Sequence, residues 1–139
     1  VFSTLHTVDA AQTIDRIVDV FDPDQQAQIR TQLSVTLQAV VSQQLLPTKD
    51  GKGRIAAFEV MIATPSIRTL IRDGKTHQLN TDIQTGGDHG MQSLDSCLLG
   101  LVREGIVDYE IALSKCSSIQ EFTRRAAKDG IAGAAYATT

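Results

Sequence analysis

Residues 1–21 read VFSTLHTVDAAQTIDRIVDVF, and their hydrophobic period changes partway along the stretch. The first five residues form an apolar, β-prone run that predicts a short strand. After Asp9, which is placed to cap a helix, the apolar residues recur at helical spacing. They are Ala10, Ile14, Ile17, Val18 and Phe21. A strand followed directly by a helix favours the α/β class.

The next part of the chain predicts a second helix and then a hairpin. The helix is expected to begin at Asp22-Pro23, because proline is tolerated in a first helical turn. Its apolar stripe consists of Ile29, Leu33, Leu37 and Val40. Residues 43–47 and 54–62 are dense in apolar side chains and flank the turn-rich stretch TKDGKG at 48–53. They predict a hairpin covered on both faces, with Glu59 as the polar exception.

The second half of the chain predicts a bundle of short helices. Thr64 is placed to cap a helix over residues 66–73, and Gly74 suits the left-handed conformation that ends many helices. Further apolar residues at helical spacing are Leu79 and Ile83, then Met91, Leu94, Leu98, Leu101 and Val102. These patterns indicate at least two more helices before the last part of the chain.

We expect three regions along the chain. Residues 1–63 form the α/β part, residues 64–127 form a helical subdomain, and residues 128–139 form a flexible tail with little apolar bulk. The last helix opens at Ser118 with capping-box spacing. Its expected packing residues are Ile119, Phe122 and Ala126.

Charge and hydropathy exclude several kinds of partner. The 139 residues carry 13 basic and 16 acidic side chains, a formal net charge of -3, without a basic tract that could follow a phosphate backbone. Nucleic acid is therefore not expected as a partner. No apolar run reaches the ~20 residues of a membrane helix, so direct membrane insertion is not expected either.

Cysteine and histidine spacing gives no indication of a metal site. Cys97 and Cys116 form neither a C-x-x-C pair nor a disulfide framework, which predicts free thiols in a reducing compartment. His6, His77 and His89 lie too far apart for H-x-x-x-H spacing. The sequence also lacks a G-x-S-x-G elbow, so no nucleophile is assigned.

The chain begins inside an apolar run and without an initiator methionine. Domain boundaries usually fall in polar, flexible linkers, so this start predicts a fragment of a longer protein. A buried strand that has lost its neighbours would open with such a run.

Residues 6–21 resemble the histidine box of the secretion ATPase superfamily, in the H-T-x-x-A-x-x-T-x-D-R form typical of PilT-type retraction ATPases. The resemblance continues through SQQL at 42–45, RIAAFEVM at 54–61, IQTGG at 83–87 and GMQSLD at 90–95. It therefore covers most of the chain.

A second motif is similar to A-I-R-N-L-I-R-E, a marker of retraction motors. Its members here are Ser66, Ile67, Arg68, Thr69, Leu70, Ile71, Arg72 and Asp73. Three positions differ conservatively from that motif, namely Ser66, Thr69 and Asp73. The resemblance implies a role in coupling ATP turnover to pilus withdrawal.

The resemblance implies the C-terminal part of a RecA-like P-loop ATPase core followed by short helices. The intact protein would bind ATP and Mg²⁺, assemble as a hexameric ring, and retract type IV pili during twitching motility. It would be cytoplasmic and peripheral to the inner membrane, held there through the pilus machinery.

The family's phosphate-binding loop and acidic boxes lie upstream of the histidine box. The 139 residues contain no G-x-x-x-x-G-K-[ST] motif. No catalytic residue is therefore assigned, and this chain alone is expected to be inactive and to bind nucleotide weakly, because nothing cradles the γ-phosphate.

Three residues of the histidine box are the nucleotide-proximal candidates. His6 follows the expected strand, and strand ends in α/β sheets carry ligand groups, so its imidazole is a candidate donor to a phosphate oxygen. A loop histidine bonded to its own backbone explains the same pattern. Thr7 and Thr13 join His6 as candidates, although threonines near helix starts are often caps.

Charged residues on two helices are candidates for interaction. Asp15, Arg16 and Asp19 are interface candidates in a ring, or simply a solvated helix face. Arg68 and Arg72 are neighbours on a helical surface and are either coupling residues or ordinary surface residues.

Two alternative functions remain open at this stage. One is a pilus-assembly or type II secretion ATPase, which shares the histidine box; the motif at 66–73 argues against it. The other is a non-catalytic helical assembly module.

Overall fold

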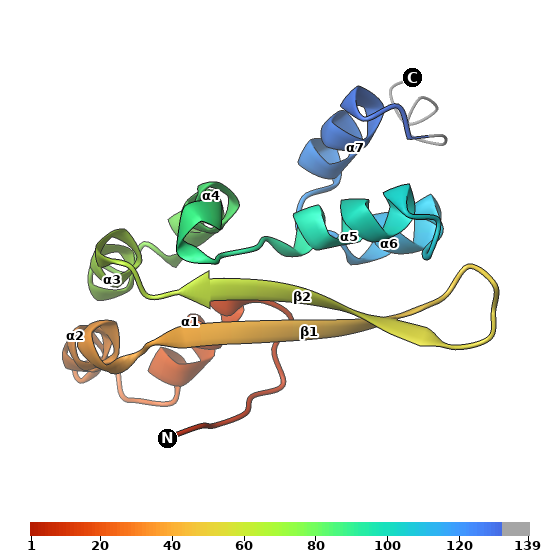
Figure 1. Ribbon diagram of the computed structural model, residues 1–139. Helices are drawn as coiled ribbons and strands as arrows, with labels where there is room; N and C mark the ends of the chain where they lie inside the picture. Colours follow the sequence, from red (N-terminus) through yellow and green to blue (C-terminus); the bar gives the residue numbers. More distant parts are fainter. Residues whose placement is uncertain (132–139) are drawn as a thin grey trace. The chain divides into compact units, whose positions relative to one another are not determined.

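The computed structural model describes residues 1–131. Its regular elements are α1 (Ala10–Asp19), α2 (Gln26–Thr36), β1 (Ala39–Pro47), β2 (Arg54–Ile62), α3 (Pro65–Arg72), η1 (Thr76–Gln78), α4 (Leu79–Thr85), η2 (Gly87–His89), α5 (Leu94–Arg103), α6 (Tyr109–Lys115) and α7 (Ile119–Lys128). The two strands form an antiparallel hairpin (Figure 1). The predicted α/β class and the predicted hairpin are therefore confirmed.

The described residues divide into two compact units. The first consists of Val1–Ser42 and Glu59–Ser93, and the second of Gln43–Phe58 and the chain from Leu94 onward. Each strand of the hairpin contributes residues to both units. This division by packing does not follow the expected boundary between residues 63 and 64. The expected tail falls mostly on residues 132–139, which lie outside the described residues.

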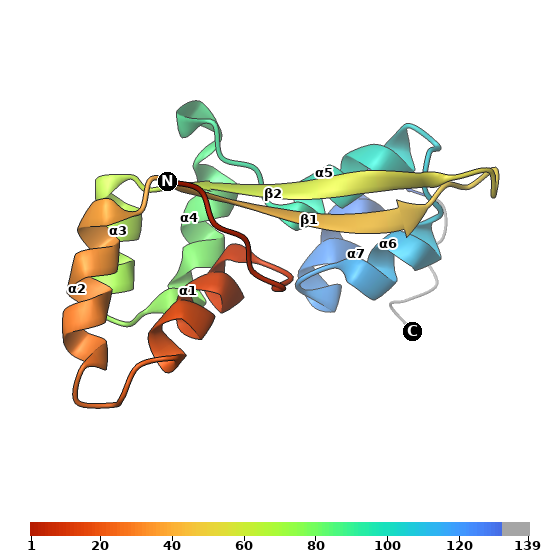
Figure 2. The ribbon, with the colours of Figure 1, turned by 90° about the horizontal axis from the view of Figure 1, so that it is seen from below.

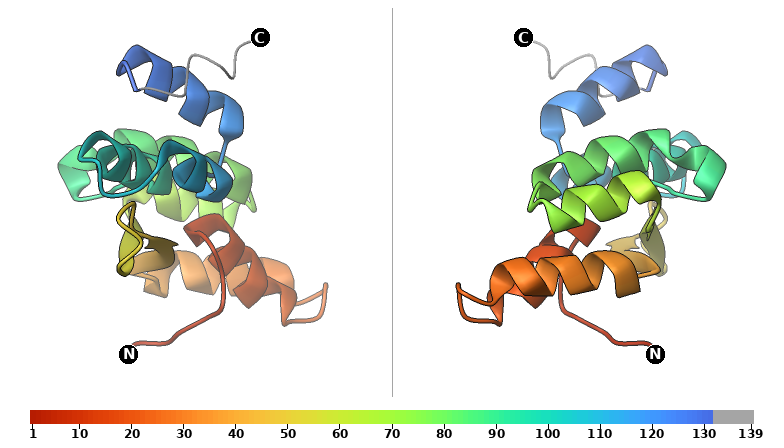
Figure 3. Two further views of the ribbon diagram at one scale, coloured as in Figure 1. Left: turned by 90° about the vertical axis from the view of Figure 1, so that its right-hand side faces the viewer. Right: turned by 90° about the vertical axis from the view of Figure 1, so that its left-hand side faces the viewer.

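The first unit packs helices α1 to α4 around one apolar cluster. Its buried members are Ala10, Ile14, Met61, Ile67, Ile71, Leu79, Ile83 and Met91. The helical spacing in α1 and α3 places their apolar residues on one face, which this cluster buries. Helices α2 and α3 lie side by side (Figure 3).

Two predicted helix caps in the first unit are confirmed. Asp9 accepts a hydrogen bond from the Gln12 amide at 2.7 Å, and Thr64 accepts one from the Ile67 amide at 3.4 Å. Helix α3 ends where Gly74 takes a φ of 71°, in the left-handed region that favours glycine. The sequence thus specifies both ends of α3.

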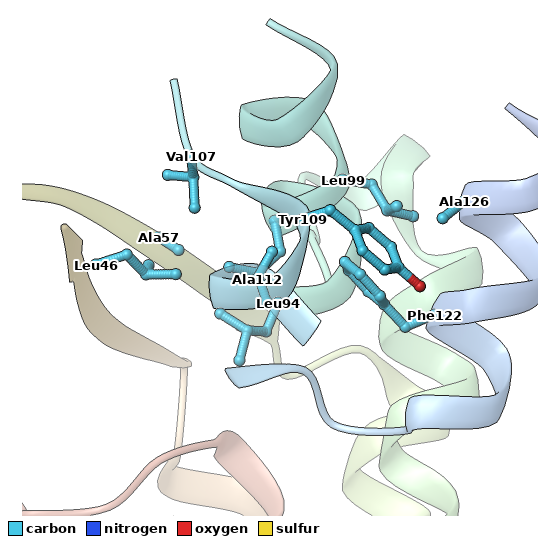
Figure 4. Close-up of a cluster of buried hydrophobic side chains, with 10 residues drawn as sticks. Leu46, Ala57, Leu94, Leu99, Val107, Tyr109, Ala112, Phe122 and Ala126 are labelled. Atoms are coloured by element: carbon cyan, nitrogen blue, oxygen red, sulfur yellow. The ribbon is translucent and has the colours of Figure 1, made fainter. Parts of the chain in front are cut away.

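The second unit has its own core. The rings of Tyr109 and Phe122 stack with centroids 5.9 Å apart (Figure 4). The other buried members are Leu46, Ala57, Leu94, Leu98, Leu99, Val107, Ala112 and Ala126. Aromatic stacking of this kind adds about 0.5–1.5 kcal/mol beyond the area that the rings bury.

A buried carboxylate stabilises the start of α7. Asp95 is 3% exposed and accepts hydrogen bonds from the amides of Ser117 at 2.7 Å and Ser118 at 3.4 Å. Ser118 in turn accepts from the Glu121 amide, as the capping-box spacing predicts. The segment between α6 and α7 is therefore attached to the first turn of α5.

The predicted strand at residues 1–5 is wrong. These residues carry no helix or strand (Figure 2). Val1 and Phe2 are fully exposed. A strand needs a neighbour to receive its main-chain hydrogen bonds, and within residues 1–131 the one sheet is the β1–β2 hairpin. Local β-propensity alone does not form a strand.

Three smaller expectations also need correction. Helix α2 begins at Gln26, because Asp22-Pro23 lies in a turn closed by the Gln25 amide donating to the Asp22 carbonyl oxygen at 2.8 Å. The hairpin is not covered on both faces, since Leu45 of β1 is 50% exposed. Ile119 does not pack into the core and is 64% exposed.

Candidate functional site

The turn before α1 is closed by hydrogen bonds between its own residues. The Thr7 and Thr13 hydroxyl oxygens lie 2.7 Å apart, and the Thr13 hydroxyl donates to the Asp9 carbonyl oxygen at 2.8 Å. Because a hydroxyl has one proton, Thr13 accepts from Thr7. The Val8 amide donates to Gln12 Oε1 at 3.1 Å. The structure thus brings Thr7 and Thr13 together.

His6 lies next to this turn and is exposed. Thr7 is half-buried and Thr13 is buried, and their hydroxyl protons are directed into the turn itself. Among the three candidates, His6 is the one whose side chain faces solvent. Its imidazole is the group chemically suited to donate to a phosphate oxygen.

A buried acid beside this turn is a site residue that sequence reasoning did not assign. Glu59 on β2 is 2% exposed, and its Oε1 accepts a hydrogen bond from the Ala10 amide at 3.0 Å. The available signal was its position as the single acid within an apolar strand. A buried acid is rarely found without a partner, so a specific contact was foreseeable.

The charged residues of α1 have different surroundings. Asp15 is exposed and accepts a hydrogen bond from the Thr76 hydroxyl at 2.9 Å, which connects α1 to η1. Arg16 and Asp19 are exposed. Asp15 therefore has a structural contact, whereas Arg16 and Asp19 remain interface candidates.

Helix α3 carries the second motif, and its apolar side is buried. Ile67 and Ile71 are fully buried and Leu70 is half-buried. Thr69 is exposed and its hydroxyl donates to the Pro65 carbonyl oxygen at 3.0 Å. Ser66 bonds through its hydroxyl to the Asp82 carboxylate of α4.

The two arginines of α3 differ in environment. Arg68 is half-buried, and its Nη1 donates to the Ser34 carbonyl oxygen of α2 at 2.6 Å. Arg72 is exposed and forms an ion pair with the adjacent Asp73 at 3.2 Å. The sequence pattern treats the two alike, but Arg68 hydrogen-bonds to another helix whereas Arg72 pairs with its own neighbour in the chain.

The glycine-containing segment at 83–92 packs closely on itself and on β2. A Cβ on Gly86 would lie 2.3 Å from Met91 Cε and 2.8 Å from the Asp82 carbonyl oxygen. Val60 of β2 and Gln92 exchange main-chain hydrogen bonds at 2.8 and 3.0 Å. This segment therefore holds in place the second half of β2, which carries Glu59.

Within residues 1–131, no group of three or more histidine, cysteine or acidic side chains is arranged to hold a metal ion. Cys97 and Cys116 are free thiols. No helix of the described residues is both long and apolar enough to span a bilayer.

Two curated relatives are similar to the chain over most of its length. The type IV pilus retraction ATPase PilT of Pseudomonas aeruginosa is 52% identical over 122 residues, which are 88% of this chain and 35% of the relative. A twitching motility protein of Neisseria gonorrhoeae is 46% identical over 123 residues, 88% of this chain and 33% of the relative.

Two solved structures are also similar to the chain. The crystal structure of the pilus retraction motor PilT with bound ADP superposes with a TM-score of 0.75 and 38% identity, covering 86% of this chain and 33% of that one. The ATPase DotB of Legionella pneumophila, at 20% identity and a TM-score of 0.61, shares the fold. No family model matches the chain. The chain spans about a third of the length of these relatives and is a homologue of the C-terminal part of the PilT-type pilus retraction ATPases.

Proposed function

We propose that this chain acts as the C-terminal part of an ATP-driven motor that retracts type IV pili. The observation that carries the proposal is the turn of residues 6–13, which leaves an exposed imidazole beside two threonines bonded to each other. The identity to relatives named as retraction and twitching motility proteins supports it. The retraction activity, the cargo and the partners are proposed for the whole protein of which this chain is the C-terminal part.

The side chains of the turn fit one edge of a phosphate site. An imidazole N–H donates well to a phosphate oxygen, so His6 suits contact with a nucleotide phosphate. The hydroxyl protons of Thr7 and Thr13 already donate to acceptors within the turn. The Asp9 carboxylate already accepts from the Gln12 amide. A single ring N–H does not replace a cradle of main-chain amides and Mg²⁺, so this chain alone binds ATP weakly.

Assembly into a ring is part of the same proposal. Arg16 and Asp19 are exposed charges on one helix, suited to pair with opposite charges on a neighbouring copy. The ring, usually hexameric in this family, would dock onto the inner-membrane pilus machinery from the cytoplasm.

The rival proposal is a pilus-assembly or type II secretion ATPase. The helix at Pro65–Arg72 favours the retraction motor, because its sequence is similar to the retraction motif. A purely non-catalytic assembly module does not account for the similarity of residues 6–21 to the histidine box of ATPases.

Replacement of His6 by alanine in the full-length protein tests the proposal. Loss of a donor to the transferring phosphate should lower kcat for ATP hydrolysis by about 10-fold or more, with oligomeric state unchanged. His77→Ala is the matched control, because His77 is also exposed but lies on η1. Equal ATPase rates for the two variants would contradict the proposed role.

A further inference from the structure

Glu59 is a buried acid whose contacts join two elements of the first unit. It lies on β2, is 2% exposed, and accepts a hydrogen bond from the Ala10 amide at 3.0 Å. Burial of a carboxylate is unfavourable unless hydrogen bonds compensate for the water that it loses. An apolar residue would fill the strand position without this cost, so the acid has a specific task here.

That task concerns the first turn of α1. Ala10 is the first residue of the helix, and its amide is one of those without an acceptor inside the helix. Asp9 accepts from the Gln12 amide, but this bond lies within the helix end itself. The bond from Ala10 to Glu59 instead connects the start of α1 to a strand 49 residues away in sequence.

The strand end that carries Glu59 is held in place. The adjacent Val60 exchanges two main-chain hydrogen bonds with Gln92, at 2.8 and 3.0 Å. Met61, the next residue, is fully buried. Glu59 therefore connects α1 to a part of the unit whose own position is well fixed.

The first turn of α1 and the turn of residues 6–13 before it are joined by hydrogen bonds. Thr13 accepts from Thr7 and donates to the Asp9 carbonyl oxygen, and the Val8 amide donates to Gln12. A displacement of the helix start would therefore carry the turn with it. We infer that Glu59 is a positioning residue that sets the place of His6 by holding the first turn of α1 against β2.

This inference rests on the proposed function, since it needs His6 to act on the nucleotide. A general structural role for Glu59 would lower stability but would act independently of His6. A positioning role predicts that the fold-losses in kcat caused by the two substitutions do not multiply in the double variant. A double-mutant cycle separates these cases.

The experiment measures kcat and KM for ATP in the full-length protein with His6→Ala, Glu59→Gln and both changes together. Glutamine keeps the shape of Glu59, but one of the two acid oxygens becomes an NH2 donor. Misplacement of His6 should lower kcat by about 10-fold with KM changed less. The double variant should be no slower than His6→Ala alone.

Two further variants keep the test decisive. Glu59→Asp retains the acid group but is shorter by one methylene, so it should show the same loss if Glu59→Gln does not fold. Asp95→Asn is the matched control, because Asp95 is likewise buried and accepts main-chain amides, but in the second unit. Its fold-loss in kcat should multiply with that of His6→Ala in the double variant.

The outcomes separate this inference from the proposed function. If His6→Ala leaves kcat unchanged, the proposed function fails. If His6→Ala is slow but both Glu59 variants turn over at the normal rate, the positioning role alone is wrong. The same holds if the fold-losses in kcat of His6→Ala and Glu59→Gln multiply in the double variant.

Discussion

Arg68 of α3 donates a hydrogen bond from Nη1 to the Ser34 carbonyl oxygen of α2, over 2.6 Å. Ser34 lies in the last turn of α2, where carbonyl oxygens lack partners within the helix. The positive guanidinium also complements the negative end of the helix dipole. One residue of the retraction-type motif is therefore a cap for the neighbouring helix.

Replacement of Arg68 by alanine should weaken the attachment of α3 to α2. Loss of a hydrogen bond from a charged donor costs about 1.5–3 kcal/mol, and partial exposure of Arg68 favours the lower end. In the full-length protein, we expect retraction to be lost while much ATPase activity is retained. Twitching assays and ATP turnover, measured on the same variant, check this prediction.

Arg72→Ala provides the control for that prediction. Arg72 is exposed and pairs with its neighbour Asp73, and exposed ion pairs contribute about 0–1 kcal/mol. Its stability should therefore be close to wild type. A parallel loss of ATPase activity and retraction in Arg68→Ala would argue against a coupling role.

The sequence predicted helix ends better than it predicted tertiary contacts. Asp9, Thr64 and Ser118 were recognised as caps because capping depends on residues three positions apart. The strand predicted at residues 1–5 failed because pairing depends on a neighbour that local sequence does not reveal.

The candidate site shows the same limit. The sequence named Thr7 and Thr13 as candidates beside His6, but it did not predict that their hydroxyls bond to each other. Glu59 and Ser34 meet their partners across 49 and 34 residues of chain. Such contacts follow from packing of whole elements, and no periodicity in the sequence encodes them.

Asp95→Ala should destabilise the second unit by about 1–3 kcal/mol. The change removes the buried acceptor of the Ser117 and Ser118 amides, and because these two residues are exposed, the cost is that of the lost hydrogen bonds. Faster amide hydrogen exchange at the start of α7, measured by mass spectrometry, would report the loss. Exchange in α3 should be unchanged, and acceleration in both helices would show that the effect is not local.

Alkaline pH should selectively weaken the region around Cys116. Burial, and to a lesser extent the Asp95 carboxylate, raises the pKa of Cys116 above the ordinary thiol value of 9.0. A raised pKa in the folded state means that the stability contribution is present below the unfolded-state pKa and is lost as pH rises through the folded-state pKa.

Alkylation with iodoacetamide tests the state of this thiol. At pH values near 9, Cys116 should react more slowly in the folded protein than in the protein unfolded by urea, because only the thiolate reacts. The Cys97→Ser variant isolates the signal of Cys116. Equal rates in the folded and unfolded protein would show that burial does not suppress the thiolate.

Gly86→Ala should destabilise the first unit, whereas Gly87→Ala should not. The new Cβ at residue 86 would lie 2.8 Å from the Asp82 carbonyl oxygen and 3.1 Å from Met91 Cβ, so backbone or core must shift. Overpacking of this kind costs about 1–3 kcal/mol. The φ of Gly86 is -88°, which any residue adopts, so the cost arises from space alone.

Gly87 is the adjacent control, because a Cβ there meets nothing within 4 Å. Urea unfolding of the two variants, followed by circular dichroism, compares their midpoints directly. Gly86→Ala should shift the midpoint down, and Gly87→Ala should remain near wild type. Because Met91 is followed by Gln92, the partner of Val60, a shift at Gly86 should also speed amide exchange at the end of β2. Equal midpoints would mean that the segment accommodates the extra methyl group and does not fix the strand end.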